Sequence, residues 1–173
     1  MQFSVGDKIM YPSKGAGRIV GVRRQELVEG FENYYVIEIP EQELTISVPM
    51  RKMGELGVRS VMSRGKLTRV LDTLRGVPCR LPKSYKERQE QIRGKLKTGR
   101  PLPIAEAVRD LTWHQHVRHS TKKDGDLLSR GRQFLAGEVA LLTGDEVTDA
   151  REKIDAALAV VTAREPDQAS ASE

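Results

Sequence analysis

The sequence predicts an α+β protein, in which a small SH3-like β domain is followed by an all-α domain of about five helices. Two observations carry this prediction. Over the first 60 or so residues, short apolar runs such as YYVIEI have the pattern of half-buried strands, and glycine and proline separate them. Beyond that point, apolar residues recur at helical spacing. We therefore expect a β domain at residues 1–62, a helical domain at 63–163 and a disordered tail at 164–173.

Four strands account for the β domain. Pro12 and Gly15 mark the turn between the first two, because proline fixes φ and glycine tolerates a positive φ. The run Gly15-Ala16-Gly17 could suggest a phosphate loop, but β-branched residues follow it where such a loop needs a helix, so we interpret it as a structural turn. So many short strands in so few residues indicate a strongly bent sheet or small barrel. The expected strands are Lys8–Tyr11, Arg18–Gln25, Tyr34–Ile39 and Leu44–Pro49.

Five helices account for the second domain. Ser84 and Glu87 form a capping-box pattern that opens the second helix, and Thr143 with Glu146 forms another before the fifth. The segment HSTKKDGD predicts a loop between the third and fourth helices. The expected helices are an apolar stripe over Leu67–Leu74, the segment Tyr85–Lys97, a stripe from Ile104 that ends near Val117, one over Leu127–Leu142 and one over Val147–Val161.

The charge is concentrated in the middle of the chain. The net charge is +5, but residues 66–135 carry 17 lysines and arginines against 7 acidic residues, and residues 136–173 carry 3 against 9. A basic segment next to an acidic one predicts a polyanion partner for that segment only. The alternative interpretation is an ordinary solvated helical surface.

Membrane, disulfide-rich and enzyme classes fit the sequence poorly. It has no apolar run of about 20 residues, no basic-then-apolar start and one cysteine, Cys79, so we expect a cytoplasmic protein. His114, His116 and His119 could suggest a metal site, and Cys79 beside Arg80 a nucleophile, but neither has the acid or base that would complete it. We expect no catalysis, no cofactor and no metal.

Several motifs resemble one family along nearly the whole chain. VGDKIMYPSKGAGRI, LTISVP and GVRSV resemble the N-terminal domain of the CarD/CdnL family of bacterial transcription regulators, which is similar to the polymerase-interacting domain of the transcription–repair coupling factor. LPKSYKERQEQIRGKLKTG, IAEAVRDL and RGRQFLAGEVAL resemble the helical domain of the same family. The resemblance implies a Tudor-like domain that binds the β subunit of RNA polymerase and a helical domain that binds promoter DNA.

The resemblance also implies a DNA-binding site at the start of the second helix. In the family, a tryptophan there wedges into the minor groove at the upstream edge of the melted bubble, and Tyr85 holds this position here. An aromatic residue among cations at a helix start can wedge into a groove, although hydrophobic packing is the alternative role. Trp113 lies elsewhere and is not the wedge. The expected DNA-binding residues are Lys83, Tyr85, Lys86, Arg88, Lys122 and Lys123.

The polymerase-binding site is expected at an exposed strand edge of the β domain, where unpaired backbone groups can accept a partner strand. We place it at the Arg23–Gln25 strand end and an adjoining strand, with residues Arg23, Arg24, Gln25, Ile46, Ser47, Val48 and Pro49. The leading hypothesis is a regulator that bridges polymerase and promoter DNA and stabilises the open complex. A protein adaptor that docks on polymerase with little DNA contact is the alternative, favoured by Glu87 and Glu90.

Overall fold

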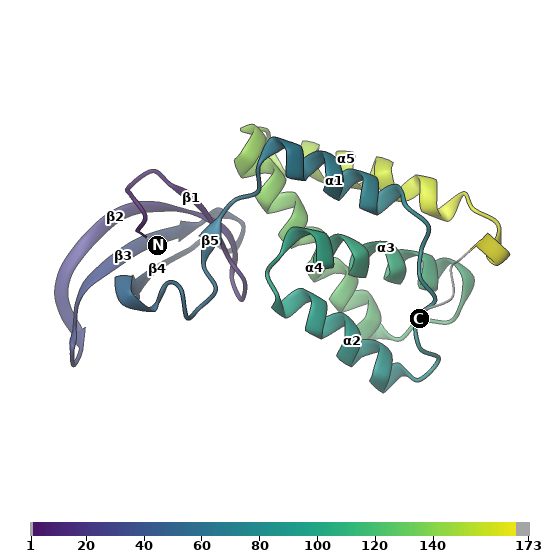
Figure 1. The fold of residues 1–173 in the computed structure, drawn as a ribbon, viewed down its shortest axis with the longest axis horizontal. Coiled ribbons are helices and arrows are strands. Elements are labelled where there is room, and N and C mark those ends of the chain that lie inside the picture. Colours follow the sequence, from purple (N-terminus) through teal and green to yellow (C-terminus); the bar gives the residue numbers. More distant parts are fainter. Residues whose placement is uncertain (1, 169–173) are drawn as a thin grey trace.

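The computed structural model describes residues 2–168, and within them a β sheet is followed by five α-helices. The prediction of an α+β protein is confirmed. The sheet lies at one end of the molecule and the helices at the other (Figure 1), and α4 contacts β1 and β2 of the sheet. The predicted disordered tail, 164–173, is described only as far as the short 3₁₀ turn Pro166–Gln168, and the rest of it lies outside the described residues.

The sheet is antiparallel, with strand order β4-β3-β2-β1-β5. Two strands have the predicted bounds, two extend beyond them, and the two-residue β5 was not predicted because so short a strand leaves no periodic pattern. The strands are β1 Lys8–Tyr11, β2 Gly15–Val28, β3 Phe31–Ile39, β4 Leu44–Pro49 and β5 Arg59–Ser60.

The glycines after β1 allow the turn into β2 and the close approach of β2 to β3. Gly15 has a φ of +111°, which other residues rarely adopt. A Cβ on Gly17 would lie 2.6 Å from the backbone oxygen of Glu38, so only glycine allows β2 and β3 to approach this closely. Because Gly15 begins a strand and not a helix, the run is a structural turn and not a phosphate loop.

The N-terminus is fixed to the core of the β domain by Tyr35. Its hydroxyl donates to the backbone oxygen of Phe3 at 2.8 Å and accepts from the backbone N–H of Phe3 at 3.0 Å. The two rings meet edge to face. Ile9, Ile19 and Ile37 are fully buried beside them, as the alternation of each strand predicts.

Two of the five helices, α3 and α4, lie at the centre of the helical domain, and the other three pack around them. α1 and α5 lie on one side and α2 on the other, with α3 and α4 between them (Figure 1). Apolar residues from all five helices make one core, which also includes Met10 and Ala16 of the β domain. No helix among residues 2–168 has both the length and the apolar character needed to cross a membrane. The helices are α1 Arg64–Arg75, α2 Tyr85–Lys97, α3 Pro101–Val117, α4 Lys122–Thr143 and α5 Val147–Thr162.

The predicted caps differ from those in the structure. α2 begins where predicted, but the Ser84 side chain makes no capping bond. Thr143 ends α4, and its hydroxyl donates to the backbone oxygen of Val139, so it does not open α5. The capping box forms instead between Thr121 and Asp124. α4 therefore begins inside the segment that was predicted to be a loop.

The two parts of the chain are joined by a buried ion pair. Glu138 of α4 is fully buried and accepts hydrogen bonds from both terminal nitrogens of Arg59, at 2.6 and 2.9 Å, and from the backbone N–H of Met62 at 2.7 Å. Arg59 also donates to the backbone oxygen of Gly99. The bidentate geometry restricts orientation as well as distance, so the sheet and the helices are held in a fixed arrangement.

Replacing Arg59 by methionine should lower the free energy of unfolding by about 3 kcal/mol, because it leaves the Glu138 carboxylate buried without a cation. Urea unfolding measures the loss. Arg64→Met, which removes an exposed arginine at the start of α1, is the control and should change stability by about 0.5 kcal/mol or less.

The double variant Arg59→Met with Glu138→Gln should recover part of the loss, because no charge then remains buried. Equal stability of the Arg59→Met and Arg64→Met proteins would show that the pair does not hold the junction.

Candidate nucleic-acid interface

Tyr85 is the first residue of α2 and is 53% exposed. Lys83 and Lys86, on either side of it, are also exposed, as are Lys122 and Lys123 at the start of α4. The ring of Tyr85 therefore reaches solvent among cations at a helix start. Every member of the predicted DNA-binding set but one is therefore exposed, and that these residues bind DNA stays a prediction.

Arg88 is that member, and it does not face solvent. Its side chain is 4% exposed and forms an ion pair with Asp124 of α4, with Nη2–Oδ2 at 2.8 Å and Nε–Oδ1 at 3.2 Å. Its Nη1 donates to the backbone oxygens of Pro82 and Lys83. The expectation that Arg88 contacts DNA is therefore replaced by a structural role: it holds the segment before Tyr85 against α4.

Asp124 is the centre of this network. It also accepts from the backbone N–H and hydroxyl of Thr121 at 2.9 Å and from the side chain of Gln89. Burial alone would raise the pKa of Asp124, but the hydrogen bonds from Arg88 and Thr121 outweigh burial and hold this pKa well below its usual range. The carboxylate is thus ionised at neutral pH, and the starts of α2 and α4 are tied together through it.

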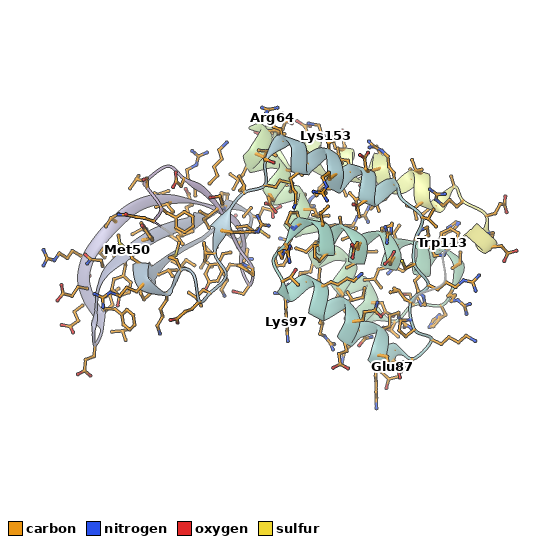
Figure 2. All side chains as sticks on the ribbon, viewed as in Figure 1. Met50, Arg64, Glu87, Lys97, Trp113 and Lys153 are labelled. Atoms are coloured by element: carbon orange, nitrogen blue, oxygen red, sulfur yellow. The ribbon has the colours of Figure 1, made fainter. Side chains whose placement is uncertain are left out.

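The exposed surface of α2 carries both signs of charge. Glu87 lies near its beginning and Lys97 at its end (Figure 2), and Glu90 is exposed between them. Lys95 is occupied by Glu106 of α3, with Nζ–Oε2 at 3.0 Å. The basic character of the interface therefore comes from the residues around Tyr85 and not from the whole length of α2.

The histidines and Cys79 do not form a reactive site. His114 is buried, whereas His116 and His119 are exposed, and no group of His, Cys, Asp or Glu within residues 2–168 could hold a metal ion. The backbone N–H of Cys79 donates to Asp110 at 2.9 Å, and Arg109 approaches its Sγ at 3.7 Å. These contacts fix the loop before α2 to α3.

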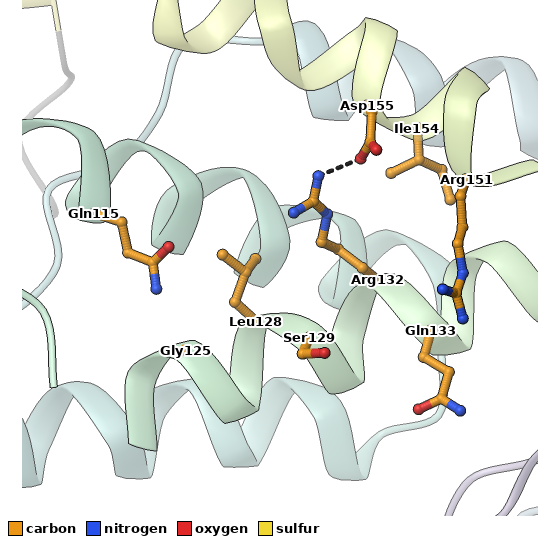
Figure 3. Close-up of a pocket in the computed structure, with 9 residues that line it drawn as sticks. All are labelled: Gln115, Gly125, Leu128, Ser129, Arg132, Gln133, Arg151, Ile154 and Asp155. Atoms are coloured by element: carbon orange, nitrogen blue, oxygen red, sulfur yellow. Dashed lines mark hydrogen bonds and ion pairs between the residues drawn. The ribbon is translucent and has the colours of Figure 1, made fainter. Parts of the chain in front are cut away.

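A pocket of about 480 Å³ between α3, α4 and α5 is lined mainly by polar side chains (Figure 3). Arg132 of α4 forms an ion pair there with Asp155 of α5. The lining includes Gln115, Ser129 and Arg151 but neither histidine nor cysteine. The one carboxylate in the lining, that of Asp155, is held by Arg132.

The predicted polymerase-binding residues divide between two faces of the sheet. Arg23 pairs with Tyr34, which pairs with Pro49, and Ser47 is two residues from Pro49 on the same strand. Because directly paired residues share a face and strands alternate, Arg23, Ser47 and Pro49 share one face.

The other members of the set are placed differently. Val48 is buried and Ile46 packs on the same core, so their side chains face inward. Arg24 lies within 3.7 Å of Glu32, and Gln25 lies in the irregular stretch before Val28. β3 separates the Arg23–Gln25 segment from β4, so the expectation that these segments adjoin is wrong. β4 is an edge strand, with one side unpaired.

Two comparisons with known proteins show which family this chain resembles. The CarD-like/TRCF RID domain, an RNA-polymerase-interacting domain, matches residues 3–62, and the C-terminal domain of CarD matches residues 69–155. The chain is 28% identical over 142 residues to a protein of Bacillus subtilis (strain 168) named "Putative transcription factor YdeB", a match that covers 82% of this chain and 93% of the other.

The two domain matches occur in the same order as the two parts of the fold, and together they span most of the chain. They support a role in transcription, with RNA polymerase as the partner that the first of these domains implies. The resemblance noted in the sequence is thereby confirmed, and the chain belongs to the CarD family.

Proposed function

We propose that this protein binds the β subunit of RNA polymerase through its β domain and upstream promoter DNA through the start of α2, and that it thereby stabilises the open complex. The observation that carries the proposal is the position of Tyr85. A half-exposed aromatic ring stands at the start of α2 between exposed Lys83 and Lys86, and a buried ion pair ties this helix start to the start of α4, where two more lysines are exposed.

A wedge stabilises melted DNA by differential binding. Unstacking a base step costs a few kcal/mol, and an inserted apolar surface offsets part of that cost only while the step is open. Tyr85 would therefore bind the open state more tightly than the closed duplex, which is the condition for shifting the equilibrium between them. Its effect would fall mainly on the rate at which the bubble closes.

The fixed junction supports this function. A DNA contact that is weak in free solution becomes effective when polymerase holds the protein beside the promoter, because tethering raises the local concentration. The Arg59–Glu138 pair restricts the arrangement of the two binding surfaces, so little orientational freedom remains to be lost when both are engaged. Because Arg88 is buried, four lysines remain of the predicted basic residues. So few cations would bind free DNA weakly, which agrees with a contact that depends on tethering to polymerase.

The adaptor hypothesis is the second candidate. Glu87 and Glu90 are exposed on α2 and would repel a phosphate backbone that ran along this helix. A salt titration of binding to free DNA distinguishes the two functions. Several phosphate contacts give a steep fall of log K with log salt, and an adaptor gives a flat one.

Tyr85→Ala should shorten the lifetime of the polymerase–promoter open complex by about fivefold or more, because loss of an aromatic stacking surface costs at least about 1 kcal/mol. Tyr85→Trp should lengthen it, because tryptophan offers a larger flat surface and needs to solvate no hydroxyl. The measurement is the decay of heparin-resistant complexes.

Val160→Ala is the control, since it truncates an apolar side chain on α5 that is 44% exposed. Equal lifetimes for the alanine, tyrosine and tryptophan proteins would remove the wedge and leave the adaptor function.

The double variant Arg23→Glu with Ser47→Glu should weaken capture of polymerase by about tenfold or more, because it places two negative charges on the face that we assign to the β subunit. A pull-down with purified polymerase measures this. Arg69→Glu, which reverses an exposed charge on α1 outside the β domain, is the control. Undiminished capture by the folded double variant would place polymerase elsewhere on the β domain.

A further inference from the structure

A small pocket lies between the loop that leads into α2 and the C-terminal end of α3, and Lys83, two residues before Tyr85, lines it. Its volume is about 160 Å³. Its apolar lining includes Leu81 and Trp113, and its polar lining is formed by Arg80, Lys83, His114 and Arg118. Neither the wedge nor the polymerase contact uses the arginines or the histidine of this set.

The pocket is strongly positive. Three cations line it and no carboxylate does. Arg80, Lys83 and Arg118 are exposed, and within residues 2–168 none of them forms an ion pair with a carboxylate. Three cations left unbalanced around one pocket are complementary to an anion.

His114 adds a buried polar atom that has no partner. The residue is 5% exposed, and its Nε2 makes no hydrogen bond, although its ring bonds to the backbone of His119. In the charged imidazolium both ring nitrogens carry a proton, so Nε2 then needs an acceptor, and the cost of leaving it unpaired is removed when a ligand supplies one. An anionic oxygen is the strongest acceptor for an imidazole N–H.

The geometry points to a phosphate site, in which Arg80, Lys83 and Arg118 surround one phosphate group and His114 donates to it from Nε2. We assign this phosphate group to the DNA backbone, next to the base step into which Tyr85 inserts. This assignment of the source rests on the proposed function, whereas the phosphate site itself does not.

A consequence is that binding depends on pH. Burial lowers the pKa of His114, and Arg88 of α2 and the neighbouring Arg118 lower it further, while Asp124 of α4 and the hydrogen bond to His119 oppose them. Arg80 and Lys83 also line the pocket. A bound phosphate favours the charged imidazole, so it raises this pKa. Affinity should therefore be highest below the pKa of the free protein and should fall as pH rises through the pKa of the complex.

The first test uses inorganic phosphate and the free full-length protein. The chain has 3 histidines, so their imidazole proton signals can be followed separately by NMR while pH is varied. With phosphate, the titration midpoint of His114 should move to higher pH than in chloride of equal ionic strength, and the His116 and His119 signals should not respond. No movement, or an equal response of all three histidines, overturns the site.

The second test uses a short forked duplex of promoter sequence. Arg118→Ala should weaken binding by about fivefold and should lower the slope of log K against log salt by about 0.9. Arg69→Ala, which removes an exposed cation from α1 on the other side of the helical domain, is the control. His114→Gln retains an N–H donor that does not titrate, so DNA binding should persist while its pH dependence disappears.

The two tests separate the two sources. If inorganic phosphate moves His114 but Arg118→Ala binds the duplex as well as wild type, the pocket takes a free phosphate compound and the DNA assignment is overturned. If phosphate has no effect, the pocket is overturned, while the function of Tyr85 is still decided by the open-complex lifetime. Arg118 is exposed, so its variant tests the proposal even if His114→Gln does not fold.

Discussion

The buried pair between Arg88 and Asp124 is the interaction on which the candidate interface depends. Desolvation of two charges is costly, and the pair is stable because nearly every donor and acceptor in it is used. These bonds join the loop before α2 and the first turns of that helix to the start of α4, and the two paired residues are 36 positions apart in sequence. A wedge needs a rigid support, since a ring on a mobile helix end would lose orientation as it inserted. In our proposal the Arg88 cation supports Tyr85, which contacts the DNA, and makes no DNA contact of its own.

The sequence predicts an element correctly where signals close by in the chain determine its bounds. α2 has the predicted bounds because a proline-rich loop precedes it and Gly99, with a positive φ, follows it. Local rules could not identify Arg88 as a buried residue. It lies on a helix with few apolar residues, among other cations, and its partner is 36 residues away. The Thr121–Asp124 capping box could have been found from its spacing, and it would have placed the start of α4 correctly.

The β domain shows a different limit of sequence reasoning. Alternation identifies strands but not the register between them, and register decides which residues share a face. The structure places a bulge between Ile19 and Gly21, which shifts the pairing of β2 with β3. As a result Arg23 lies in line with Pro49 across β3, while Val48 turns into the core. No property of the separate strands predicts this outcome.

The rigid junction at Glu138 also bears on how such a protein could discriminate between promoters. If the protein functions as we propose, the fixed arrangement that the Arg59–Glu138 pair maintains would bring Tyr85 to one base step at a set distance from polymerase. Discrimination then needs no contact with base edges. It follows from how easily the step at that distance unstacks, and pyrimidine–purine steps, which deform most readily, would be favoured there.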